Sequence, residues 1–218
     1  MTEIKICGLT RPQDVQLCAE LEVTWVGFVF YPPSPRSISA EQAALLHQTI
    51  PTAQQGGPSR VGLFVKPTLE MINDVLAHVP LDVLQLYTTP DIAQQIKQQT
   101  GLPVWLARGI KTASDLPTQA STLDRFIIEA PADEHDTRPG GLGKRFDWSL
   151  TQGWNAPLPW LLAGGLNAHN VQQAIATSKA TAVDVSSGVE SHPGHKSPEL
   201  LKNFVKNAHA GGCLSTGE

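Results

Sequence analysis

The sequence predicts an α/β protein that folds as a single (β/α)₈ barrel of the TIM type. Short apolar, β-branched runs recur eight times along its 218 residues, and most are separated by a segment with helical periodicity. Eight such units average about 27 residues each, which fits a short barrel. A doubly wound open sheet is the alternative, but that fold usually needs only five or six strands. The count of units therefore favours the barrel.

The eight expected strands are the apolar runs themselves. They begin near Glu3, Trp25, Arg60, Leu81, Val104, Arg125, Trp160 and Ala182. Strands that alternate with helices pair in parallel and are joined by right-handed crossovers. The carboxyl ends of all eight strands should therefore meet at one mouth of the barrel.

The expected helices lie between these strands. The first begins near Pro12, a residue favoured in a first turn, and the second begins with the capping box Ser39-x-x-Gln42. Three more are expected at 68–77, 90–99 and 167–177, the last opened by Asn167 as its cap. The helical pattern is least distinct after Lys111 and after Asp147.

Charge is sparse. The chain has 16 basic and 20 acidic side chains, a net charge of −4, and only 17% charged residues, against about 25% in an average protein. Nucleic-acid binding needs clustered Lys and Arg, so we expect no nucleic-acid partner. No apolar run is long enough to cross a membrane and the amino terminus does not resemble a signal peptide, so we expect a cytoplasmic protein without a membrane partner.

The three cysteines, Cys7, Cys18 and Cys213, form no C-x-x-C pair, which favours a reducing compartment over a disulfide scaffold or a zinc site. We expect one catalytic domain over 1–210 and a disordered tail over 211–218. A barrel sequence leaves the oligomeric state open between monomer and homodimer.

Glycine-rich turns follow the seventh and eighth strands, at 163–167 and 186–190. Backbone N–H groups in such turns can approach an anion closely, and these two positions often hold phosphate in a barrel. Either turn alone could be only a tight connection. Together they favour a phosphorylated small-molecule substrate.

Polar side chains also stand at the ends of other strands. Strand alternation places Lys5 and Cys7 on the inward face, with Cys7 at the mouth as a candidate base or nucleophile, or else as a buried inert thiol. Glu129 ends the sixth strand and is either a general acid or an ordinary loop glutamate. Arg36, in a loop stiffened by three prolines, could bind a carboxylate or simply face solvent.

Two further expectations concern charged and histidine side chains. Asp184 should point inward from the eighth strand and form a buried ion pair with Lys5 on the neighbouring first strand. His135, His192 and His195 are the conceivable metal cluster, but no carboxylate pattern accompanies them, so we expect no metal site.

With these residues in view, the sequence resembles phosphoribosylanthranilate isomerases, the (β/α)₈ enzymes of tryptophan biosynthesis. The segments that carry the resemblance are KICGLTRPQDV (5–15), GFVFYPPSPRSIS (27–39), VGLFV (61–65), LQL (84–86), GGLGKRFDW (140–148), LLAGGLNAHNV (161–171) and VDVSSGVESHPGHKS (183–197). Other phosphate-binding barrels share the glycine turns but not the first two signatures together.

The resemblance implies an Amadori rearrangement of N-(5'-phosphoribosyl)anthranilate to 1-(2-carboxyphenylamino)-1-deoxyribulose 5-phosphate, with no cofactor or metal. By family position Cys7 is the general base, Glu129 the general acid and Arg36 the ligand of the anthranilate carboxylate. The residues implied to line the phosphate site are Gly141, Gly164, Gly165, Ser187 and Gly188.

The chain departs from the family pattern at a few positions. Glu129 stands where the family has aspartate, Tyr87 and Thr88 stand where it has His-Gly, and Ser197 replaces an expected aspartate. Arg108 adds a cation past the fifth strand. Three functions stay open at this point: the isomerase itself, a related sugar-phosphate isomerase or epimerase, and a phosphate-binding barrel without catalysis.

Overall fold

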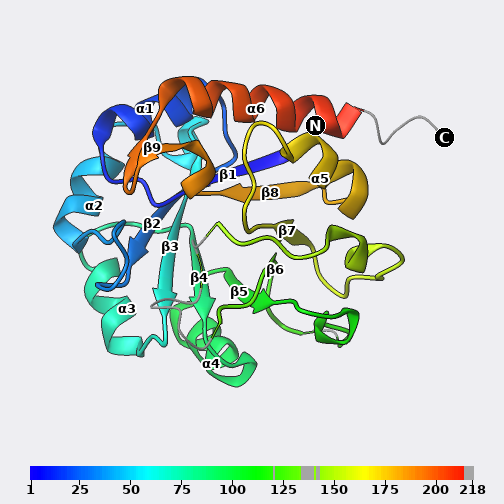
Figure 1. The fold of residues 1–218 in the computed structure, drawn as a ribbon. Helices are drawn as coiled ribbons and strands as arrows, with labels where there is room; N and C mark the ends of the chain where they lie inside the picture. The colour runs from blue at the N-terminus through cyan, green and yellow to red at the C-terminus, as the bar shows by residue number, and fades with distance from the viewer. Residues whose placement is uncertain (120, 134–139, 141–142, 214–218) are drawn as a thin grey trace.

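A closed parallel barrel of eight strands forms the protein, as the sequence predicts (Figure 1). The computed structural model describes residues 1–119, 121–133, 140 and 143–213. The strands are β1 Glu3–Cys7, β2 Trp25–Phe30, β3 Ser59–Val65, β4 Val83–Tyr87, β5 Val104–Gly109, β6 Arg125–Glu129, β7 Trp160–Leu162 and β8 Ala182–Val185. Pairing of β1 with β8 closes the barrel, with Lys5 in register with Asp184.

Helices follow the first four strands and the last two. They are α1 Pro12–Glu20, α2 Ala40–His47, α3 Leu69–Leu76, α4 Pro90–Thr100, α5 Val171–Ser178 and α6 Pro198–Cys213. The capping box predicted for α2 is confirmed. The Ser39 hydroxyl accepts a hydrogen bond from the Gln42 N–H at 3.2 Å, and the Gln42 side chain accepts one from the Ser39 N–H at 2.9 Å.

The connections after β5 and β6 are the irregular ones. In the part of these connections that the structure describes there is no α-helix, only the 3₁₀ turns η2 Ala113–Asp115 and η3 Trp148–Thr151. The sequence pattern was weakest in these two segments. Two other 3₁₀ turns, η1 Ala53–Gln55 and η4 Ser187–Val189, follow α2 and β8.

The ends of the last two helices differ from the sequence prediction. The prediction that Asn167 caps α5 is wrong, because the helix begins at Val171 and the Asn167 side chain instead accepts a hydrogen bond from the His169 N–H. Helix α6 continues to residue 213, so Gly211 and Gly212 belong to it rather than to the tail expected from residue 211. Residues 214–218 lie outside the described residues.

A short hairpin that the sequence did not predict follows β8. It consists of β9 Glu190–His192 and β10 His195–Lys196. The Lys196 N–H donates to the Asp14 carboxylate at 3.1 Å, which ties the hairpin to α1. The hairpin thus delivers Glu190 and Lys196 to the end of the barrel where β8 terminates.

The interior of the barrel is divided into an apolar half and a polar half. Side chains near the amino-terminal ends of the strands form a buried apolar cluster, in which the Trp25 and Trp105 rings meet edge to face with centroids 5.0 Å apart. Arg125 lies over the Trp25 ring at 4.9 Å and pairs with Glu3 at 2.7 Å, closing this end. Polar inward-facing side chains are therefore displaced toward the opposite mouth.

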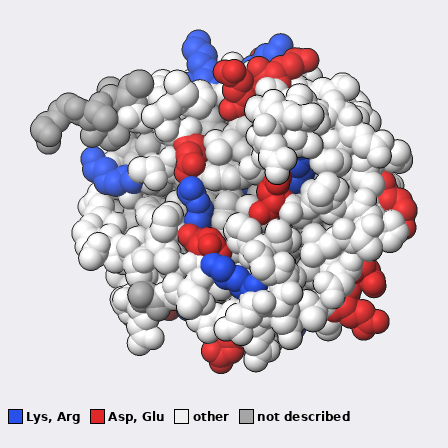
Figure 2. All heavy atoms as spheres, turned by 180° about the vertical axis from the view of Figure 1, so that it is seen from behind, with Lys and Arg blue, Asp and Glu red and all other residues white. Residues whose placement is uncertain are grey.

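The surface carries few charges. On the face shown in Figure 2, basic side chains stand near acidic ones and most of the surface is uncharged. Among the described residues, no helix is long and apolar enough to cross a membrane.

Candidate active site

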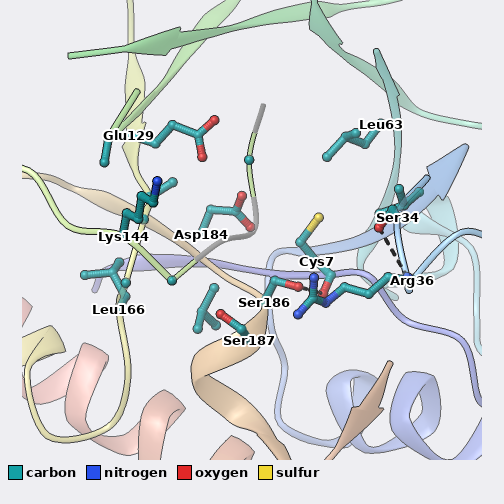
Figure 3. Close-up of a pocket in the computed structure, with 18 of the residues that line it drawn as sticks. Cys7, Ser34, Arg36, Leu63, Glu129, Lys144, Leu166, Asp184, Ser186 and Ser187 are labelled. Atoms are coloured by element: carbon teal, nitrogen blue, oxygen red, sulfur yellow. Dashed lines mark hydrogen bonds between the residues drawn. The ribbon is translucent and has the colours of Figure 1, made fainter. Parts of the chain in front are cut away.

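A cavity of about 840 Å³, including its open mouth, lies at the carboxyl ends of the barrel strands (Figure 3). Six of the residues that the sequence singled out line it: Cys7, Arg36, Glu129, Gly164, Gly165 and Ser187. They come from five strands or the loops after them, so the barrel fold is what brings them together. Gly141 lies outside the described residues, although its neighbours Gly140 and Gly143 line the cavity.

The predicted ion pair beneath the cavity is confirmed. Lys5 Nζ lies 3.0 Å from Asp184 Oδ1, and the lysine side chain is fully buried. Burial alone would lower the pKa of Lys5, but attraction to Asp184 and to Cys7 raises it above its usual value. Lys5 is therefore a fixed positive charge at the floor of the site.

Cys7 ends β1 directly above this pair. It is 5% exposed, and burial raises the pKa of its thiol although Lys5, through its charge and a hydrogen bond, opposes the rise. Cys7 is consequently a neutral thiol at pH 7 in the unliganded site. Lys5 is placed to stabilise the thiolate when the proton leaves.

Glu129 ends β6 and projects into the cavity on the side away from Cys7 (Figure 3). Burial raises the pKa of its carboxyl group to about 8, while the hydroxyl of Tyr87, acting as a hydrogen-bond donor, lowers it in part. At pH 7 the carboxyl group holds its proton, which is the state a general acid requires.

Arg36 is buried and held by a carboxylate that the sequence analysis did not identify. Its Nε donates to Glu190 Oε1 at 2.8 Å and its Nη2 donates to Glu190 Oε2 at 2.7 Å. Lys196 Nζ donates to the same Glu190 Oε1 at 2.7 Å. The stiff loop contributes as well, since the Arg36 N–H donates to Ser34 Oγ at 3.2 Å (Figure 3).

Glu190 and Lys196 could have been suspected from their position just after the eighth strand. The sequence does not predict their pairing with Arg36, because 154 residues separate Glu190 from Arg36 and the hairpin that brings them together was not predicted. The pKa of Glu190 is lowered because the hydrogen bond and charge of Arg36, together with Lys196, outweigh the effect of burial.

The two glycine turns pack against each other at one end of the cavity. Gly164 and Gly165 adopt positive φ of 84° and 64°, and a Cβ atom on Gly164 would lie 2.8 Å from the Lys144 carbonyl oxygen. Gly188 does not line the cavity. A Cβ there would lie 1.8 Å from the Leu166 carbonyl oxygen, so glycine is required for the two turns to pack together.

No metal site is evident in the part of the chain that the structure describes: no three His, Cys, Asp or Glu side chains gather there. The His192 and His195 rings stack with centroids 3.9 Å apart, and His195 Nδ1 lies 3.1 Å from Arg11 Nη1. His135 lies outside the described residues.

Comparison with known proteins agrees with this geometry. The family described as N-(5'phosphoribosyl)anthranilate (PRA) isomerase matches residues 4–207. The chain belongs to this family. Among its relatives, the N-(5'-phosphoribosyl)anthranilate isomerase of Rhodospirillum rubrum is 46% identical over 96% of this chain and 99% of that protein. The enzyme of Acidiphilium cryptum is 43% identical over 96% of this chain and all of the relative.

Solved structures of family members share the fold. A monomeric form of the dimeric enzyme of Thermotoga maritima superposes with a TM-score of 0.80 at 34% identity, over 96% of this chain and all of that one. A structure of phosphoribosylanthranilate isomerase in complex with reduced 1-(o-carboxyphenylamino)-1-deoxyribulose 5-phosphate gives 0.81 at 33% identity, with the same coverage. The eight-stranded architecture and the family assignment thus agree, and the protein is an enzyme of the isomerase class.

Proposed function

We propose that this chain catalyses the Amadori rearrangement of N-(5'-phosphoribosyl)anthranilate, with Glu129 as general acid and Cys7 as general base. The observation that carries the proposal is the pair of opposite environments in one cavity. A carboxyl group that keeps its proton at pH 7 lies on one side, and a thiol beside a buried lysine lies on the other.

The acid step opens the sugar ring. Glu129 donates its proton to the furanose oxygen, the bond from that oxygen to C1' breaks, and a C1'=N iminium ion forms. The former ring oxygen keeps the proton as a hydroxyl group. A carboxyl group with a pKa of about 8 is protonated at pH 7 and can give this proton without a metal.

The base step moves a proton from carbon. After the thiol has lost its proton to solvent, the Cys7 thiolate takes the C2' proton. The electrons of that C–H bond form the C1'=C2' bond while the π electrons of the C1'=N bond return to nitrogen, which gives an enolamine, and tautomerisation gives the 2'-ketone. No oxidant or reductant is needed. Because burial raises the pKa of Cys7, the thiolate depends on nearby positive charge, supplied by Lys5 and by the iminium ion itself.

Substrate binding falls to the rest of the cavity. Arg36 binds the anthranilate carboxylate, and the backbone around Gly164, Gly165 and Ser187, with Gly141, holds the phosphate, while Gly188 lets the two glycine turns pack together. Held at both ends, the ribose lies between acid and base, and such positioning lowers the barrier. We further propose that the protein acts in the cytoplasm, without a cofactor, as a monomer or homodimer.

Turnover of freshly made phosphoribosylanthranilate, followed through loss of its fluorescence, tests the roles. We expect Glu129→Gln and Cys7→Ala each to lower kcat by about 10²- to 10⁴-fold. The matched control is Glu70→Gln, an exposed glutamate of α3, which should turn over like the wild type. If Glu129→Gln and Cys7→Ala both turn over at the wild-type rate, the acid and base assignments are wrong.

The same assay decides the two alternatives. A related sugar-phosphate isomerase with a changed substrate would leave phosphoribosylanthranilate unconverted but turn over another aminoaldose or aldose phosphate. A barrel without catalysis would bind inorganic phosphate and convert neither.

A further inference from the structure

Arg36 does not enter the cavity as an isolated cation. It belongs to a buried cluster of three charges, Arg36, Glu190 and Lys196, whose side chains are 5%, 4% and 0% exposed. Only Arg36 lines the cavity, while Glu190 and Lys196 lie behind it. Arg36 can therefore contact a ligand in the cavity, whereas Glu190 and Lys196 contact Arg36 or each other and do not reach the ligand.

The contact between Glu190 and Arg36 fixes the plane of the guanidinium group. Two parallel N–H···O bonds of 2.8 and 2.7 Å hold the Nε and Nη2 edge, a geometry that restricts rotation as well as adding energy. Gly8 makes room for this arrangement, since a Cβ atom there would lie 2.4 Å from Arg36 Cδ. Arg36 is thus set in one orientation by groups on β9 and on the loop after β1.

Glu190 alone would weaken the attraction of Arg36 for an anion, because the pair carries no net charge. Lys196 adds a positive charge to this neutral pair. Its ammonium group lies 2.7 Å from Glu190 Oε1, so the three side chains together carry one positive charge. Lys196 also donates to the Ser186 carbonyl oxygen at 3.1 Å, and the Ser186 hydroxyl donates to the Cys7 carbonyl oxygen at 3.0 Å.

We propose that Glu190 is a positioning residue that orients Arg36 toward the carboxylate of the substrate, and that Lys196 supplies the counter-charge that keeps Arg36 attractive to an anion. The inference rests on the proposed role of Arg36 in binding the anthranilate carboxylate. It assigns the specificity for an ortho-carboxylated aromatic ring to three residues rather than one.

The test compares two ligands that differ only in the carboxylate. One is reduced 1-(o-carboxyphenylamino)-1-deoxyribulose 5-phosphate, and the other is the same compound with an unsubstituted phenyl ring. Their dissociation constants are measured by calorimetry. For Glu190→Gln we expect a loss of at least about 10-fold for the first ligand and less than about 3-fold for the second. Equal losses for both ligands, or no loss for either, would overturn the proposal.

Two further variants keep the test decisive. Glu190→Asp retains the charge but shortens the reach, so we expect a smaller loss that is still confined to the carboxylated ligand; it decides the matter if Glu190→Gln does not fold. The double variant Glu190→Gln, Lys196→Met restores the net charge of +1 without the orienting bonds. It should stay weak for the carboxylated ligand, and full recovery would show that the Glu190 carboxylate is not needed to orient Arg36.

A separate variant distinguishes failure of this inference from failure of the proposed function. Arg36→Lys keeps the charge but lacks the planar fork, and we expect a selective loss for the carboxylated ligand of at least about 10-fold. If Arg36→Lys shows no such loss, the proposed role of Arg36 fails. If Arg36→Lys shows the selective loss for the carboxylated ligand and Glu190→Gln does not, only the positioning role of Glu190 fails.

Discussion

Two glutamates are buried at the same mouth of the barrel, and their surroundings differ in kind. Glu190 lies between Arg36 and Lys196, whose ammonium and guanidinium groups approach to 2.7 and 2.8 Å and lower the pKa of its carboxyl group. Glu129 has the hydroxyl of Tyr87 as its hydrogen-bonding neighbour, and burial raises its pKa to about 8.

The contrast teaches that burial raises the pKa of a carboxyl group unless cations lie against it, so residue type alone does not decide what the group can do. An ionised glutamate between two cations is a rigid acceptor that holds other groups in place. A buried, protonated glutamate is in the state from which a proton can be donated. One barrel mouth thus contains an ionised carboxylate between two cations and a protonated carboxyl group.

Glu190→Gln should produce the largest loss of stability. It leaves Arg36 and Lys196 buried without their counter-charge, and we expect the free energy of unfolding at pH 7 to fall by about 3 kcal/mol. Because the folded pKa of Glu190 is lowered, its stabilisation is present at neutral pH and is lost as the pH falls below about 4.5. Urea unfolding at pH 7 and pH 4 checks this. A loss that is the same at both pH values would mean that the charges do not interact as described.

Glu129→Gln should act in the opposite direction. The folded protein keeps a proton that the unfolded chain releases between pH 4.5 and about 8, so wild-type stability falls as the pH rises through that window. The variant lacks this loss. We therefore compare the free energy of unfolding of the variant with that of the wild type at two pH values. The difference, variant minus wild type, should be larger at pH 8.5 than at pH 4 by on the order of 2–4 kcal/mol. A difference that does not change with pH would show that Glu129 is not protonated in the folded state.

Tyr87→Phe should have the smallest effect. The Tyr87 hydroxyl lowers the pKa of Glu129, so its removal should raise that pKa further and extend the pH-dependent loss of stability to higher pH. The change corresponds to the loss of one hydrogen bond, about 1 kcal/mol. Tyr31→Phe is the matched control, because Tyr31 is the second of the two tyrosines and lines the same cavity. If the two variants shift the curve equally, the Tyr87 hydroxyl is not the cause.

Much of the fold could be predicted because strands and helices follow from the local spacing of apolar residues. The apolar runs located all eight strands, and alternation along β1 and β8 was enough to pair Lys5 with Asp184 across the seam of the barrel. Cap and turn geometry was less accessible. Asn167 has the residue type of a helix cap, but its side chain caps the turn before α5 because the chain needs that turn to leave the Gly164-Gly165 loop.

Part of the site could also be predicted, because residues at the carboxyl ends of the strands lie at the mouth of the barrel. Cys7, Arg36 and Glu129 all line the cavity. What the sequence could not show is which groups surround each of them. The pairing of Arg36 with Glu190 depends on the hairpin β9–β10, and the raised pKa of Glu129 depends on its burial and on the nearby charge of Asp184, all of which exist only in the folded chain.

The central claim is that Glu129 is protonated at pH 7 while Glu190 is ionised. Infrared difference spectroscopy of the two variants, Glu129→Gln and Glu190→Gln, against the wild type measures this directly. At pH 7 we expect the band of a protonated carboxylic acid to disappear in Glu129→Gln and to persist in Glu190→Gln, and in the wild type to vanish as the pH rises through about 8. A wild-type spectrum with no protonated carboxyl group at pH 7, or a band that survives Glu129→Gln, would contradict the account.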